Sequence, residues 1–142
     1  MLLSQILKVK GDVVFTATPH ETVEAICALL HSRRVGAMVV TEGDKVVGIV
    51  SERDMVRALA QGGAAAMVKP VSAYMSRDVL FAELNETVDA LLAKMTDRRV
   101  RHLPVLEQSR LVGIVSIGDL VKHKISEVEA EADSLKAYIS AG

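Results

Sequence analysis

The chain has 142 residues and a formal net charge of −1, with 17 basic and 18 acidic residues mixed along its length. This balance provides no broad basic surface, so it argues against nucleic acid and anionic membrane as partners. Half of the residues are apolar and only 3% are aromatic, so the core must be aliphatic. No apolar run approaches the roughly 18 residues that cross a bilayer. With a single cysteine, Cys27, no disulfide can form within the chain, and we expect a soluble cytoplasmic protein.

The first half of the sequence alternates short apolar runs with helical patterns. Residues 13–15 are predicted to form a short strand, and residues 22–30 place their apolar side chains on one helical face. Two further strands are expected at 37–41 and 46–50, because turn-forming residues separate these apolar runs. A second helix is predicted from residue 52 to about residue 60. The predicted unit is therefore β-α-β-β-α.

The second half repeats the first at an offset of 65 residues. Between Val14 and Val56, roughly nineteen of forty-three positions are identical to their counterparts 65 residues later, which indicates two copies of one supersecondary unit. Strands are expected near 79–82, 103–106 and 111–115, and a helix near 87–95. We therefore predict an α/β fold with a first repeat at 1–62, a second at 63–124 and a helical extension at 125–142.

The closing helix is predicted to run on without a breaker after residue 119. Its apolar residues recur in steps of four and three, which is a heptad pattern. We call them the heptad stripe: Val121, Ile125, Val128, Ala132, Leu135 and Ile139. Such a stripe needs a partner surface, either the body of the same chain or a second subunit.

The strongest local signal is the motif Gly-Ile-Val-Ser-x-x-Asp, which occurs at 48–54 and again at 113–119. Each copy joins the end of a strand to the start of a helix, where unpaired N–H groups can bind a phosphate and glycine lets a ligand approach the backbone. A carboxylate one turn further on can accept hydrogen bonds from the two hydroxyl groups of a ribose. The same Ser-x-x-Asp pattern is also a capping box, in which the side chains satisfy only the helix's own backbone.

These residues resemble the cystathionine-β-synthase (CBS) repeat family, in which each β-α-β-β-α unit carries Gly, two apolar residues and Ser/Thr-x-x-Asp before its last helix. The resemblance covers nearly the whole chain and is closest to stand-alone bacterial proteins of two repeats. It implies that the repeats pair about a pseudo-two-fold axis as a Bateman module. It also implies two clefts that bind AMP, ADP, ATP, NAD-type dinucleotides or S-adenosylmethionine.

The resemblance assigns residues to each cleft. The residues expected in the first cleft are Ile49, Ser51, Arg53, Asp54, Val100, Arg101 and His102. The residues expected in the second cleft are Val35, Gly36, Ala37, Ile114, Ser116 and Asp119. Arg101 and Arg53 have no basic counterparts in the second cleft, so we expect the first to favour the more phosphorylated ligand and the second to bind weakly or remain empty.

We therefore predict a regulatory module without catalytic residues that binds an adenine nucleotide and signals to an unidentified partner protein. The sequence shows no metal-ligand spacing among its histidines and single cysteine, so no metal and no required cofactor are expected. The resemblance and the heptad stripe together predict a homodimer whose orientation stays open. The alternative is a structural dimerisation module with no physiological ligand, in which both motifs act only as caps.

Overall fold

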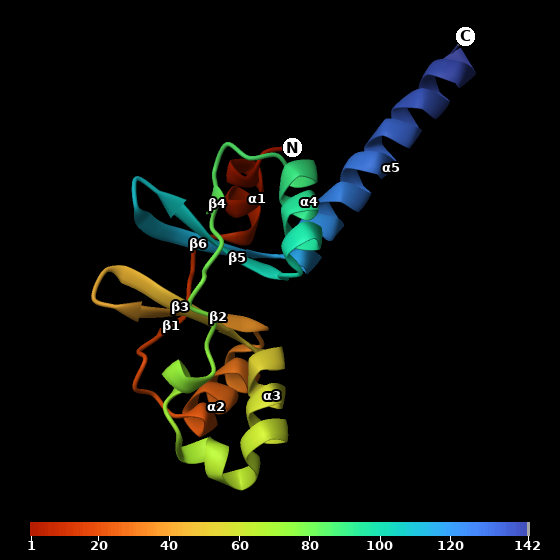
Figure 1. Cartoon of the computed structure of the whole chain (residues 1–142). Coiled ribbons are helices and arrows are strands. Elements are labelled where there is room, and N and C mark those ends of the chain that lie inside the picture. Colours follow the sequence, from red (N-terminus) through yellow and green to blue (C-terminus); the bar gives the residue numbers. More distant parts are fainter. Residues whose placement is uncertain (142) are drawn as a thin grey trace. The chain divides into compact units, whose positions relative to one another are not determined.

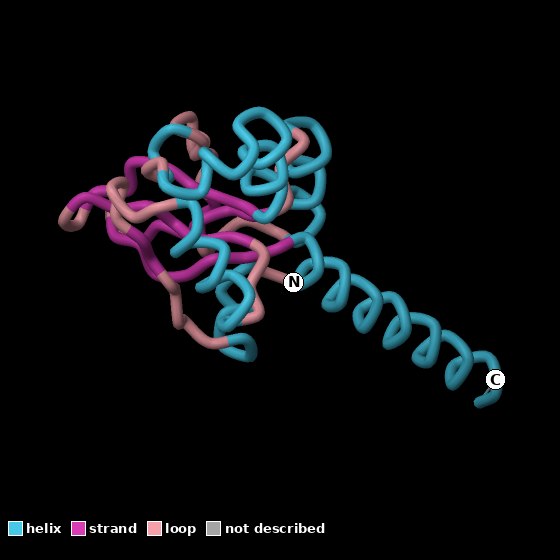
Figure 2. Tube along the Cα trace, turned by 90° about the horizontal axis from the view of Figure 1, so that it is seen from below, coloured by secondary structure: helices cyan, strands magenta, loops and turns pink. Residues whose placement is uncertain are grey.

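A computed structural model describes residues 1–141 and confirms the α/β fold (Figure 1). The chain forms two compact units, of which one is a continuous segment and the other is made of two segments. One unit is Val13–Leu80. The other combines Met1–Asp12 with the chain from Phe81 onward. Each unit contains a three-stranded sheet with helices packed against it (Figure 2).

In the Val13–Leu80 unit, the central strand pairs with a parallel strand on one side and an antiparallel strand on the other. The antiparallel pair is bulged between Val40 and Thr41. Met38, Val40 and Val50 are at most 2% exposed and pack with the helices in the core. The elements are β1 (Thr16–Ala17), α2 (Val23–Arg33), β2 (Ala37–Glu42), β3 (Lys45–Ser51), α3 (Glu52–Gly62), and the 3-10 helices η1 (Gly63–Val68) and η2 (Val71–Ala73).

The second unit repeats this arrangement, with a bulge at the matching place between Val105 and Leu106. The amino-terminal helix is part of its core, because Leu3 and Ile6 are fully buried. The elements are α1 (Leu3–Lys10), β4 (Ala82–Glu83), α4 (Val88–Arg98), β5 (His102–Glu107), β6 (Arg110–Ser116) and α5 (Ile117–Ala141).

The predicted central hairpins and helices are confirmed, with ends shifted by a few residues. Thr22 and Thr87 lie just before α2 and α4, and each accepts a hydrogen bond from a backbone N–H of the first turn, as a helix cap does. The strand predicted at 13–15 is wrong, because pairing with β2 begins only at Thr16. The strand expected at 79–82 likewise reduces to β4, which begins at Ala82.

Three helical segments were not predicted from the sequence: α1, η1 and η2. α1 packs on the second repeat, whereas the segment with η1 and η2 packs on the first. Val88 N–H donates to Met1 O and Leu3 N–H to Glu86 O, which fixes α1 on the second sequence repeat. Val23 N–H donates to Lys69 O and Val71 N–H to Glu21 O, which fixes the segment after α3 on the first. The helical segment that precedes each repeat in the sequence therefore packs on the other repeat.

Candidate functional site

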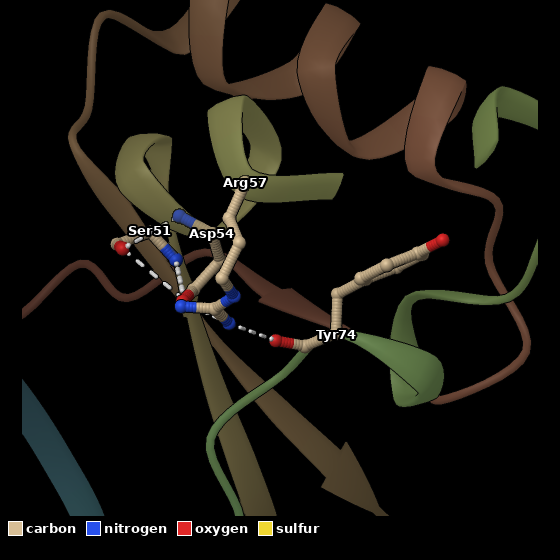
Figure 3. Close-up of polar contacts among 4 residues, drawn as sticks. All are labelled: Ser51, Asp54, Arg57 and Tyr74. Carbon is tan, nitrogen blue, oxygen red and sulfur yellow. Dashed lines mark hydrogen bonds and ion pairs between the residues drawn. The ribbon is translucent and has the colours of Figure 1, made fainter. Parts of the chain in front are cut away.

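In the first motif, β3 ends at Ser51 and α3 starts at Glu52 (Figure 3). The Ser51 backbone N–H donates to Asp54 Oδ2 over 2.8 Å, and its hydroxyl donates to the same oxygen over 3.1 Å. The Asp54 backbone N–H in turn donates a hydrogen bond of 3.4 Å to Ser51 Oγ. This is a complete capping box, so the structural role that the sequence allowed is present.

Asp54 is the one buried charged residue among those the structure describes, with 7% of its surface exposed. Its second oxygen, Oδ1, accepts a hydrogen bond of 2.9 Å from Arg57 Nη2, which lies one turn further along α3. Arg57 also donates to the backbone oxygen of Tyr74 over 3.0 Å (Figure 3). The Asp54 carboxylate therefore lies in a hydrogen-bond network that joins α3 to the segment after η2.

The strand before the motif is held by the same segment. Ile49 exchanges two backbone hydrogen bonds with Ser76, of 3.0 and 2.9 Å. At Gly48 a Cβ atom would lie 3.0 Å from the Ser76 oxygen and would overlap the Met75 side chain. Gly48 therefore makes room for the chain itself, and the expectation that this glycine lets a ligand approach the backbone stays a prediction. At Gly113 the neighbour is Leu7 of α1.

The second motif repeats the cap with different partners. Ser116 N–H donates to Asp119 Oδ2 over 2.8 Å, and Asp119 N–H donates to Ser116 Oγ over 3.1 Å. Here the cation is Lys10, at the end of α1, whose Nζ donates to Asp119 Oδ2 and to Ile114 O over 2.6 Å each. Burial opposes ionisation of this carboxyl, but the Lys10 ammonium and the Ser116 donors outweigh it and lower the pKa of Asp119.

The remaining predicted residues lie near the start of the helix in their own unit. The backbone oxygen of Gly36 accepts from Glu52 N–H at the start of α3, and that of Arg101 accepts from Ile117 N–H at the start of α5. Arg101 and Arg53 are exposed, whereas His102 is half-buried. Val35 and Val100 are half-buried before their strands, and Ala37 is buried. Their assignment to shared ligand sites stays a prediction.

Sequence reasoning missed the two cations that neutralise the motif carboxylates. Arg57 could have been found, because a residue three positions along a helix lies beside its neighbour. Lys10 could not, since it is 109 residues from Asp119 and reaches it only through the crossed packing of α1.

Residues 1–141 contain no group of three or more His, Cys, Asp and Glu side chains able to hold a metal ion. Nor does the described chain include a helix both long and apolar enough to cross a membrane. A shallow groove of about 690 Å³ lies between Met1 and the stretch of α5 from Ser126 to Leu135. None of its lining residues belongs to the predicted ligand sites.

Comparison with known proteins identifies the repeated unit. The model of the CBS domain matches residues 9–61 and 71–126. The structure is similar to that of the CBS-domain containing protein ATU1752 from Agrobacterium tumefaciens, with 41% identity and a TM-score of 0.86, over 87% of this chain and 99% of the other.

Two further similar structures carry ligands. The CBS domain protein PAE2072 from Pyrobaculum aerophilum, complexed with AMP, is 26% identical with a TM-score of 0.74, over 84% of this chain and 89% of that one. The CBS domain pair of protein MJ0100, in complex with 5′-methylthioadenosine and S-adenosyl-L-methionine, is 26% identical with a TM-score of 0.79, over 89% and 98%. The two family matches together span more than half of the sequence and each contains one Ser-x-x-Asp cap, so this chain belongs to the CBS-domain family.

Proposed function

We propose that this chain is a non-catalytic regulatory module that binds an adenine nucleotide at its Ser-x-x-Asp motifs. Candidate ligands are AMP, ADP, ATP and NAD(H). The proposed output is a change in how the module associates with a regulated partner protein in the cytoplasm. We further propose that the module acts as a homodimer and needs no metal or other cofactor.

The chemistry common to the ligands of similar proteins supports adenosine as the recognised group. AMP, 5′-methylthioadenosine and S-adenosylmethionine, the ligands of PAE2072 and MJ0100, share adenosine but differ in what the 5′ carbon carries. A carboxylate beside the ligand suits the ribose, because it accepts hydrogen bonds from both hydroxyl groups. The observation that carries the proposal is the buried, fully oriented carboxylate of Asp54 directly after a strand end.

Ribose binding at Asp54 would require a rearrangement within α3. A carboxylate offers about four acceptor positions. Asp54 already receives hydrogen bonds from the Ser51 N–H, the Ser51 hydroxyl and Arg57. A ribose that used both oxygens would displace Arg57 from Oδ1 and also loosen its bond to Tyr74 O. We propose this release as the first step that reports ligand binding to the rest of the module.

The two motifs are proposed to differ in occupancy. Lys10 holds both Asp119 and the backbone oxygen of Ile114, so a ligand there would have to compete with an ion pair. The Asp54 motif would also gain Arg53 from its own helix and, if the predicted cleft forms, Val100, Arg101 and His102. A charge-assisted hydrogen bond contributes roughly 1.5–3 kcal/mol, so the Asp54 motif should prefer the more phosphorylated ligand.

A structural dimerisation module is the second candidate, and one observation favours it. Both capping boxes are complete with no ligand, so Ser51, Asp54, Ser116 and Asp119 already have a role in helix initiation. In that case no adenine compound would change the stability of the protein.

Thermal unfolding with AMP, ADP, ATP, NAD, NADH and S-adenosylmethionine tests the proposal. A ligand at 100 times its dissociation constant stabilises the folded state by about 2.7 kcal/mol, which raises the midpoint by several degrees. The shift should be lost in Asp54→Asn, which keeps the shape of the cap, and retained in Glu52→Gln, a change in the same helical turn at an exposed residue. No shift with any of these compounds would overturn the nucleotide proposal and favour the structural module.

A further inference from the structure

The outer part of α5 carries an exposed apolar surface. The heptad stripe is 53% exposed at Ile125, 49% at Val128, 60% at Leu135 and 67% at Ile139. Contiguous apolar surface of this kind in a soluble protein marks a contact site. The match to the CBS domain ends at residue 126, so most of this surface lies outside the repeat that the family shares.

Most of the heptad stripe does not face the body of its own unit. Leu120 is fully buried, and Glu127, on the same helical face two turns later, lies 3.3 Å from the amino-terminal nitrogen. That face of α5 contacts the unit. Most of the stripe lies on another face of the helix, although Leu135 also lines the groove beside Met1. The outer part of α5 extends past α1 and α4 (Figure 1). Packing within the same unit therefore leaves the described stripe largely uncovered, with Ile125 53% exposed and Ile139 67% exposed.

The stripe places an apolar residue at every a and d position from Val121 to Ile139, as a coiled coil requires. In heptad lettering, Ile125, Ala132 and Ile139 occupy a positions, and Val121, Val128 and Leu135 occupy d positions. β-branched residues at a with Leu at d favour two parallel strands, and the stripe has this combination at Leu135 and Ile139. From Val121 to Ile139 the stripe is about 27 Å long, at 1.5 Å for each residue.

The flanking charges distinguish between orientations. In a parallel pair in register, each g residue faces the following e residue of the other helix. Lys124 would face Glu129 of a second copy, and Glu131 would face Lys136, so every such pair is attractive. Lys124 also lies 2.9 Å from Asp89 of its own chain, so the Glu131–Lys136 pairs should contribute more.

Antiparallel pairing fits these charges less well. An antiparallel pair that overlaps the whole stripe is centred near residue 130. It places Glu129 against Glu129 and Glu131 against Glu131, which is repulsive. Shifted antiparallel registers relieve the repulsion, but they leave Ile139 or Val121 without an apolar partner.

We propose that α5 is an interaction surface for a second copy of this chain, and that two α5 helices form a parallel coiled coil in register through the heptad stripe. This inference specifies the contact and orientation of the dimer and does not depend on nucleotide binding. A failure of the nucleotide test leaves it unaffected.

Charge exchange on the full chain tests the contact. In Glu131→Lys, both symmetric pairs become repulsive, and the dimer dissociation constant measured by sedimentation should rise about 3- to 10-fold. Lys136→Glu should do the same, and the double variant should restore dimerisation. Asp133→Lys, at the neighbouring b position, is the matched control and should change the constant far less. A wild-type chain that is monomeric at every concentration, or a double variant that is not restored, would overturn the proposal.

Cysteine crosslinking tests the orientation. In a Cys27→Ala background, Leu135→Cys brings two thiols together at one d position only if the helices are parallel and in register. Mild oxidation should then give a covalent dimer. Ser126→Cys, at a b position outside the contact, should remain uncrosslinked. A stable dimer that fails to crosslink at residue 135 would overturn the parallel arrangement and indicate an antiparallel pair or another surface.

Discussion

Replacement of Lys10 by Met should destabilise the unit that contains α1. It should also reduce how strongly the free energy of unfolding of that unit falls as the pH is lowered. Lys10 Nζ donates 2.6 Å hydrogen bonds to Asp119 and to Ile114 O, and the side chains of Lys10 and Asp119 are 31% and 27% exposed. Exposed ion pairs contribute about 0.2–1 kcal/mol, and hydrogen bonds to charged groups contribute about 1.5–3 kcal/mol. Because the Lys10–Asp119 pair is partly buried, we expect it to contribute an intermediate amount to the free energy of unfolding, about 1–2 kcal/mol.

The assay is urea unfolding followed by circular dichroism at pH 7 and again near pH 3, with a thermal melt as a second measure. At this chain length, about 1–2 kcal/mol lowers the midpoint by roughly 3–8 °C. Lys8→Met is the control, because Lys8 is an exposed lysine on the same helix.

The pH dependence follows from the direction of the Asp119 shift. A carboxyl whose pKa is lower in the folded state stabilises the fold above its unfolded pKa, here near 3.8, and the contribution is lost as pH falls through the folded pKa. The difference between wild type and Lys10→Met should therefore be largest near neutral pH and should shrink below about pH 4. Equal stability of the Lys10 and Lys8 variants at pH 7, or a deficit that persists unchanged in acid, would refute this reasoning.

Three other substitutions have expected outcomes. Thr22→Ala removes the side-chain cap of α2 and should cost about 1 kcal/mol of unfolding free energy in urea titration; an unchanged midpoint would contradict the cap. Leu3→Ala, at a fully buried position of α1, should cost about 2–5 kcal/mol, whereas Val9→Ala, at a position 77% exposed, should cost little in the same titration. Gly48→Ala should lower the melting temperature because its Cβ would overlap Met75, and a second change of Met75 to Ala should recover part of the loss.

The sequence predicted those parts of the fold that are specified locally. The β2–β3 and β5–β6 hairpins follow from apolar runs separated by turn residues, and the caps at Thr22 and Thr87 follow from single residues before helical patterns. Two-residue strands such as β1 carry no periodicity that a pattern could detect. Their position is fixed by pairing with β2, which is a tertiary effect.

The crossed packing of α1 and of η1 and η2 could not be read from the sequence for a related reason. An eight-residue helix has too little periodicity to reveal its partner, and nothing in its residues distinguishes the nearer repeat from the more distant one. The contacts that determine where α1 packs, such as the hydrogen bond from Leu3 N–H to Glu86 O, join segments more than eighty residues apart. The repeat boundaries expected from sequence therefore differ from the compact units of the structure.

The crossed packing of α1 gives the second motif an electrostatic environment that differs from that of the first. Ser51 and Asp54 match Ser116 and Asp119 in position and in cap geometry, so the motif itself cannot distinguish the two sites. The cation that meets each carboxylate comes from outside the motif: Arg57 from the following helical turn in one case, and Lys10 from the crossed α1 in the other. If Arg57 were released, its hydrogen bond to Tyr74 O in the same unit would also be lost. If Lys10 were released, the end of α1 would lose its contacts with Asp119 and Ile114. If both sites bind adenosine, ligand binding at Asp54 should thus affect the segment at Tyr74, and binding at Asp119 should affect α1. The ligand preference and the structural response of each site then depend on positions at which the two repeats differ.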